Sequence, residues 1–141
     1  MRNAITTRPH SFEDKSRWAM DWYYPVLTGA LTADIASQRL SSRFEELTVA
    51  DHGVRCVADQ PWVTTAETCE CAMAYLAIGD DAMAHRLFQS IQPLRDRDGA
   101  YFTGMVFPET ITFPDGERST YSSAAVVLAA EALSNNSGAS R

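Results

Sequence analysis

Residues 62–79 read WVTTAETCECAMAYLAIG and predict the central helix of this chain. Thr64 and Glu67 have the spacing of a capping box, in which two side chains bond free backbone amides, so a helix is expected to begin here. Gly79 supplies the left-handed residue at which helices often end. Small apolar side chains recur three or four positions apart, which places them on one face and lets neighbouring helices approach closely. They are Ala66, Cys69, Met73, Leu76 and Ala77.

The apolar pattern on either side of this segment predicts four more helices, two long connections and one turn-rich hairpin. Pro25 lies inside the first helix, which must therefore begin near it or bend there. Asp80 is expected to cap the fourth helix. We expect a lead-in (1–13), a single helical domain (14–134) and a flexible tail (135–141). The other helices are predicted at 14–30, 33–47, 81–94 and 120–133, with the connections at 48–62 and 95–118 and a small β-hairpin at 101–113.

Two motifs resemble the repeat of prenyltransferase β-subunits and squalene/hopene cyclases. One is the DGAYF segment at 98–102, and the other is the TYSSAA segment at 120–125. The AMDWYYPVL segment at 19–27 and the FPDGER segment at 113–118 are most similar to actinobacterial prenyltransferase-like proteins in their C-terminal part. The resemblance covers residues 18–133 and implies an all-α fold of antiparallel helical hairpins, the α/α toroid, which also serves six-hairpin carbohydrate enzymes.

This chain departs from that family in three ways. The Asp-rich acid motif of the cyclases is absent, and the zinc-binding set of the protein prenyltransferases has no match. A complete toroid has about twelve helices, whereas about five are expected here. The expected architecture is therefore a partial ring, which implies a homo-oligomer or a partner chain that completes the helical layer.

The composition excludes several classes of function. The net charge of −6, from 12 basic and 18 acidic residues, argues against nucleic acid as a partner. No apolar run is long enough to span a membrane. The three cysteines have no framework spacing and suggest reduced thiols in the cytoplasm. Cys69 and Cys71 point about 200° apart on a helix, so we expect no metal site, and no motif indicates a cofactor.

Glu67 is the strongest catalytic candidate. Together with Asp21 or Glu109, it could form the carboxylate pair with which glycosidases perform acid–base catalysis. The alternative role of Glu67 is purely structural, as the capping residue of its helix.

The remaining candidates are aromatic and basic residues that would bind a ligand. Aromatic side chains near the helix starts could stack on sugar rings or stabilise a cation, and two arginines could grip an anion. Core packing and ordinary salt bridges are the alternatives. With Glu109 as an acidic member, the candidate ligand-binding residues are Trp22, Tyr23, Tyr24, Arg55, Trp62, Tyr101, Glu109, Arg118 and Tyr121.

Two functional hypotheses follow. In the first, the chain is a module that binds a small ligand or a partner chain at an aromatic, acidic inner rim. In the second, it is an enzyme that uses Asp21 and Glu67 on an isoprenoid or a carbohydrate. The position of the Glu67 side chain, in a cavity beside a second carboxylate or folded onto Thr64, separates the two.

Overall fold

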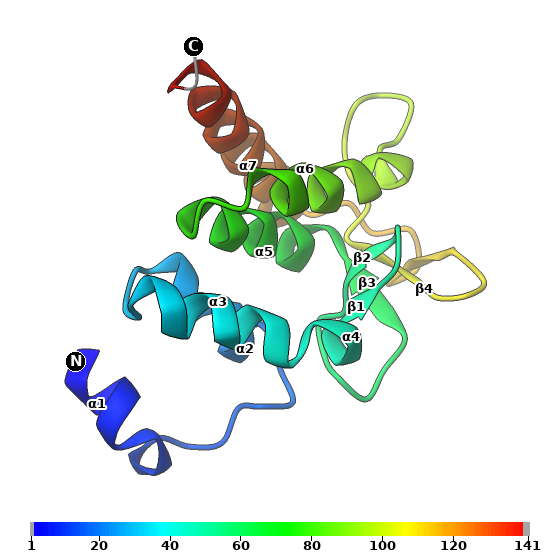
Figure 1. The fold of residues 1–141 in the computed structure, drawn as a ribbon. Coiled ribbons are helices and arrows are strands. Elements are labelled where there is room, and N and C mark those ends of the chain that lie inside the picture. Colours follow the sequence, from blue (N-terminus) through cyan, green and yellow to red (C-terminus); the bar gives the residue numbers. More distant parts are fainter. Residues whose placement is uncertain (1, 140–141) are drawn as a thin grey trace.

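The structure, a computed structural model, describes residues 2–139, so the first residue of the expected lead-in and the last two of the expected tail lie outside it. The chain begins with a short helix that an extended segment joins to the main body (Figure 1). The helices are α1 (Arg2–Thr7), α2 (Ala19–Leu27), α3 (Ala33–Ser42), α4 (Phe44–Leu47), α5 (Thr65–Ala77), α6 (Asp81–Ser90) and α7 (Thr120–Ala139), with 3₁₀ turns η1 (Pro9–Ser11) and η2 (Gln92–Leu94). The strands are β1 (Thr48–Val49), β2 (Gly53–Val54), β3 (Trp62–Thr64), β4 (Gly104–Val106) and β5 (Ile111–Phe113).

Helix α5 is the centre of the molecule, as its sequence indicates. It packs against α2, α6 and α7. Cys69, Cys71 and Ala72 are fully buried, so α5 is enclosed on more than the one face that the spacing predicts. The predicted stop is confirmed, because Gly79 adopts a φ of 80° just beyond the last turn.

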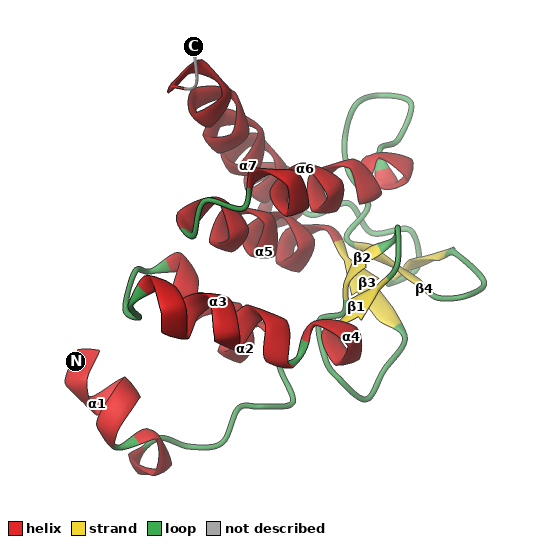
Figure 2. Cartoon of the chain, viewed as in Figure 1, coloured by secondary structure: helices red, strands yellow, loops and turns green. Residues whose placement is uncertain are grey.

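Two antiparallel sheets contradict the all-α prediction (Figure 2). The expected hairpin exists, since Met105 of β4 pairs with Thr112 of β5. However, β3 joins it as a third strand, with Val63 opposite Met105, and β1 pairs with β2. The partial toroid of helical repeats is therefore wrong. Strands of two or three residues are too short to show alternation, and the partner of β3 lies about forty positions away in β4, so no local pattern reveals this pairing.

The other predicted helices are present with different ends. The second divides at Arg43 into α3 and α4, and the fourth closes in the 3₁₀ turn η2. The Asp80 cap is confirmed by a 3.0 Å bond from the Met83 amide. Helix α7 continues to Ala139, well past the predicted end at 133. None of the described helices is both long enough and apolar enough to cross a lipid bilayer.

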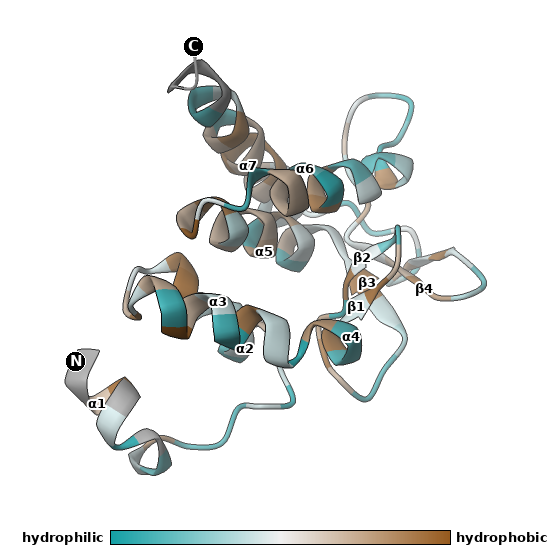
Figure 3. Cartoon of the chain, in the orientation of Figure 1, coloured by the Kyte–Doolittle hydropathy of each residue, from teal (hydrophilic) through white to brown (hydrophobic). Residues whose placement is uncertain are grey.

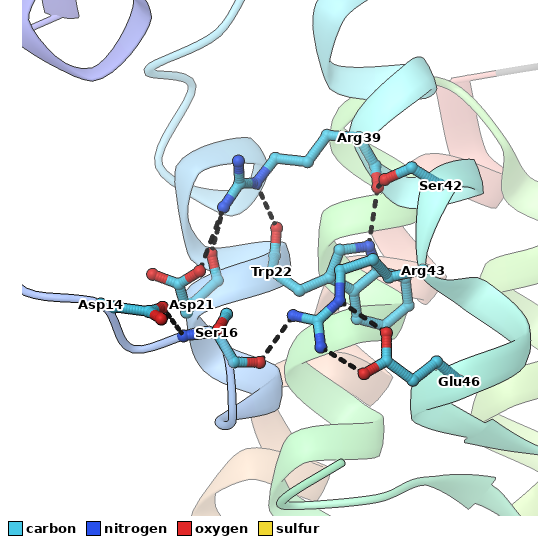
Figure 4. A network of polar contacts seen from close by, with 8 residues as sticks. All are labelled: Asp14, Ser16, Asp21, Trp22, Arg39, Ser42, Arg43 and Glu46. Carbon is cyan, nitrogen blue, oxygen red and sulfur yellow. Dashed lines mark hydrogen bonds and ion pairs between the residues drawn. The ribbon is translucent and has the colours of Figure 1, made fainter. Parts of the chain in front are cut away.

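Helix α2 continues past Pro25 to Leu27, and an arginine from α3 bonds the carbonyl that the proline leaves without an amide donor. Pro25 has no amide hydrogen to give to the carbonyl of Asp21, four residues earlier. Arg39 donates to that carbonyl at 2.7 Å and to the carbonyl of Trp22 at 2.8 Å (Figure 4). The Trp22 indole returns a 2.8 Å bond to the carbonyl of Arg39. Proline therefore neither starts nor breaks this helix, and α2 and α3 are joined at this point.

The segment around Cys56 connects the start of α2 to the start of β3. Its carbonyl accepts from the Ala19 amide and its amide donates to the Trp62 carbonyl, both at 3.0 Å. Position 53, three residues before Cys56, requires glycine, because a Cβ there would lie 2.6 Å from the Thr68 hydroxyl oxygen. These contacts bring the N-terminal ends of α2 and α5 together.

Candidate functional site

Three tyrosine hydroxyls converge on one carboxylate, that of Glu70 in α5. Tyr23 of α2 donates to Oε2 at 2.6 Å, and Tyr121 of α7 donates to Oε1 at 2.6 Å. The Tyr24 hydroxyl lies 3.4 Å from the same Oε1. An ionised carboxylate only accepts hydrogen bonds, so it matches a set of phenolic donors. The cluster joins α2, α5 and α7, which are distant in the sequence.

The surroundings keep these phenols protonated. Burial, reinforced by the charge of Glu70, raises the pKa of Tyr23 far above its ordinary value of 10. Desolvation and the bond to Glu70 also raise the pKa of Tyr121. The two residues differ in access, because Tyr23 is buried whereas the Tyr121 side chain is 55% exposed. Tyr121 can therefore touch a ligand while it holds Glu70.

Glu67 lies one turn before Glu70, on the same side of α5, and does not act as the predicted cap. Thr64 occupies the N-cap position of α5 without a side-chain capping bond. Within the described part of the chain, the half-buried Glu67 carboxylate makes no hydrogen bond or ion pair. It lies near Cys56, since burial and then the charge of Glu67 raise the pKa of that thiol to about 11. Glu67 is thus available for chemistry in a way that a capping glutamate is not.

The second predicted carboxylate of the pair lies elsewhere. Asp21 is 3.4 Å from an Arg39 nitrogen, on the side of α2 that meets α3 (Figure 4). Glu109 is exposed in the connection between β4 and β5. The carboxylate that accompanies Glu67 is instead Glu70. The i, i+3 spacing of the two glutamates was the available signal, because such residues are neighbours on a helix.

The predicted aromatic wall is only partly formed. Tyr23 and Tyr24 pack edge to face, with ring centroids 5.2 Å apart. Trp22 is buried in the core beside α3, and Trp62 stacks on Phe113 of β5 with a centroid distance of 4.8 Å. Trp22 also packs edge to face on Tyr23, with ring centroids 6.4 Å apart, whereas Trp62 makes no hydrogen bond or ring contact with the Glu70 cluster within the described residues. The packing of Trp22 and the stacking of Trp62 on Phe113 stabilise the fold, whereas Tyr23 and Tyr24 belong to the Glu70 cluster.

The other predicted ligand-binding residues have structural partners. Tyr101 is buried and donates to Gln92 at 2.9 Å. Arg118 pairs with Asp96 at 2.9 Å and with Asp98 at 2.7 Å. Arg55 reaches the Gln60 carbonyl at 3.4 Å, and its buried Nε has no partner among the described residues. Cys69 and Cys71 are free thiols, and no three His, Cys, Asp or Glu side chains in the described range 2–139 are placed to share a metal ion.

Comparison with curated proteins gives a clear similarity. The chain resembles the MMP endo-(1,4)-3-O-methyl-alpha-D-mannosidase of Mycolicibacterium hassiacum, with 48% identity over 132 residues. The aligned part is 94% of this chain and 36% of the relative, so the chain spans about a third of the length of the curated relative it matches. No protein-family model matches the chain.

This similarity overturns the resemblance to prenyltransferases and squalene cyclases. The motifs behind that resemblance have general local roles: the Asp98 carboxylate accepts from the Ala100 amide, and Ser119 accepts from the Ser122 amide where α7 begins. Such turn and cap chemistry recurs in unrelated folds. Of the two functional hypotheses, the similarity favours a carbohydrate enzyme over a module that only binds a ligand or partner.

Proposed function

We propose that this chain carries acid–base machinery of an endo-acting glycosidase for α-(1,4)-linked 3-O-methylmannose chains. The activity of the mannosidase relative supports the substrate class, at 48% identity across nearly the whole chain. The observation that supports the chemistry is the pair of glutamates on one face of α5. Glu70 has three phenols around it, and Glu67 makes no hydrogen bond or ion pair with the described residues.

The two carboxylates have different roles in this proposal. Glycosidases need one carboxyl group to protonate the leaving oxygen and a second to act on the anomeric carbon or on a water molecule. Glu67 is the proton donor, because no side chain of the described protein forms a hydrogen bond or ion pair with its carboxylate. It gives its proton to the glycosidic oxygen as the bond to the anomeric carbon breaks. Glu70 is the anion that faces the positive charge developing on the sugar ring, and Tyr23 and Tyr121 hold it in place.

Hydrolysis then completes the cycle. A water molecule adds to the anomeric carbon and returns a proton to Glu67, so the site ends in its starting state. A sugar can reach Tyr121, because more than half of its side chain is exposed. Tyr23 acts only through Glu70 and is a positioning residue.

Substitution of the two glutamates tests the proposal. We expect Glu67→Gln and Glu70→Gln each to slow hydrolysis of an α-(1,4)-linked 3-O-methylmannose oligosaccharide at least about 100-fold, the usual size of an acid–base contribution. Product release is followed by chromatography, and circular dichroism checks the fold of each variant. Glu131→Gln, at an exposed position of α7, is the matched control and should keep full activity. Full activity in Glu67→Gln would refute the assignment.

A further inference from the structure

A groove of about 640 Å³ lies between α1 and α2, and Tyr24 is one of its lining residues. Its volume is within the usual range for a small-ligand site. Its lining is mainly apolar, with one ammonium and one carboxylate group as its charged members. The lining residues on which the argument depends are Trp18, Met20, Tyr24, Pro25, Lys15 and Asp21.

The Trp18 side chain lines this groove and remains partly exposed to solvent. Its side chain is 42% exposed, although tryptophan normally contributes most of its large surface to a core. The Arg17 guanidinium stacks over the ring, 5.2 Å from its centroid, and Arg17 is itself fixed by a 3.0 Å ion pair with Asp59. The ring therefore has a defined orientation while much of its surface stays open. An exposed aromatic ring held in this way is a platform on which a sugar ring can stack.

Tyr24 connects the groove to the carboxylates. Its ring lines the groove, and its hydroxyl lies 3.4 Å from the Oε1 atom of Glu70. A glycan seated on Trp18 and Tyr24 therefore adjoins the Glu70 cluster. Asp21 and Lys15 supply an acceptor and a donor for the sugar hydroxyls that remain unmethylated.

We propose that this groove binds the methylated mannose residues next to the cleavage point and prefers methyl ethers to free hydroxyls. The inference rests on the proposed function and adds the place where the methyl groups are recognised. A free hydroxyl buried against Trp18, Met20 and Pro25 loses its bonds to water and gains none. A methyl ether has no hydrogen to leave unbonded, and its methyl group buries apolar surface.

Binding of tetrasaccharides that cannot be hydrolysed tests this preference independently of catalysis. The probes are α-(1,4)-linked tetramannosides with sulfur in the glycosidic positions, with and without 3-O-methyl groups, titrated calorimetrically into the 141-residue chain. Burial of one methyl group favours binding about fourfold, so the methylated probe should bind at least about four times more tightly. Trp18→Ala should weaken binding of the methylated probe about tenfold. It should also reduce the ratio of the affinities of the two probes to below about twofold.

Two further variants make the result decisive. Ile35→Ala removes an equally exposed apolar side chain from α3, outside the groove, and should leave both affinities unchanged. Trp18→Leu, which removes the aromatic ring but keeps apolar bulk, replaces the alanine variant if that variant does not fold. Equal wild-type affinity for the two probes, or an unchanged preference in the Trp18 variant, overturns the groove assignment. If hydrolysis still depends on Glu67, the proposed function survives that result. Failure to bind either probe, together with no hydrolysis, overturns both.

Discussion

Glu67 and Glu70 are chemically identical residues in one helix, and their neighbours give them different roles. Glu70 is surrounded by the hydroxyls of Tyr23, Tyr24 and Tyr121, whereas Glu67 has no partner in the described chain. Enzymes commonly separate the roles of two carboxylates by such differences in environment. The assignment of acid and anion in this site therefore depends on the side chains around α5.

Burial of Cys69 predicts that stability falls at alkaline pH. Burial, then the charge of Glu70, raises the pKa of Cys69 from 9.0 to about 12. Because the folded pKa is above the unfolded one, the stabilising contribution is complete below pH 9 and is lost as the pH rises toward 12. Cys69→Ala should reduce the loss in unfolding free energy between pH 7 and pH 10 by about 1.4 kcal/mol. Urea unfolding at the two pH values measures this difference.

The matched control for this prediction is Val126→Ala, which shortens a buried side chain of the same core without removing a thiol. It should lower stability by the same amount at both pH values. Tyr23, whose pKa is also raised, contributes in the same direction, so the Cys69 variant keeps part of the pH dependence. An unchanged pH dependence in Cys69→Ala would contradict the prediction.

At the scale of elements, α2 and α3 form a unit because an arginine compensates for a proline. Arg39→Met removes the donor for the Asp21 and Trp22 carbonyls and should cost about 2 kcal/mol of unfolding free energy. In a Pro25→Ala background the alanine amide can bond the Asp21 carbonyl, so the same substitution should cost about 1 kcal/mol less. Urea denaturation of the four proteins in the cycle measures the coupling.

Arg43→Met provides the control for this cycle, since Arg43 pairs with Glu46 at 2.7 Å and does not bond α2 (Figure 4). Its cost should be the same with proline or alanine at position 25. Additive effects of the Pro25 and Arg39 substitutions would show that the arginine does not replace the missing amide.

At the scale of the molecule, one face of α7 is left uncovered by the described residues. Val127 is 65% exposed and Leu128 is 55% exposed, and Figure 3 shows apolar colouring along much of α7. Contiguous exposed apolar surface is typical of an interaction site. We propose that a second copy of the chain covers this face, and we expect light scattering at high micromolar concentration to detect a dimer.

Leu128→Asp should shift the chain to the monomer, because a buried carboxylate without a partner is strongly unfavourable in an interface. Ile111→Asp, at an equally exposed position of β5, is the control and should leave the dimer intact. A wild-type chain that remains monomeric at high micromolar concentration would contradict the prediction.

The sequence by itself determined where α2, α3, α5, α6 and α7 lie, the central place of α5, its Gly79 stop, the Asp80 cap and the β4–β5 hairpin. Each of these follows from residues within a few positions of one another, through side-chain periodicity, capping or turn geometry. Only the tertiary structure decided that β3 joins the hairpin, that Arg39 satisfies the Asp21 carbonyl, and that tyrosine hydroxyls from α2 and α7 converge on Glu70. These features depend on contacts between residues from 17 to 51 positions apart, which local patterns do not encode.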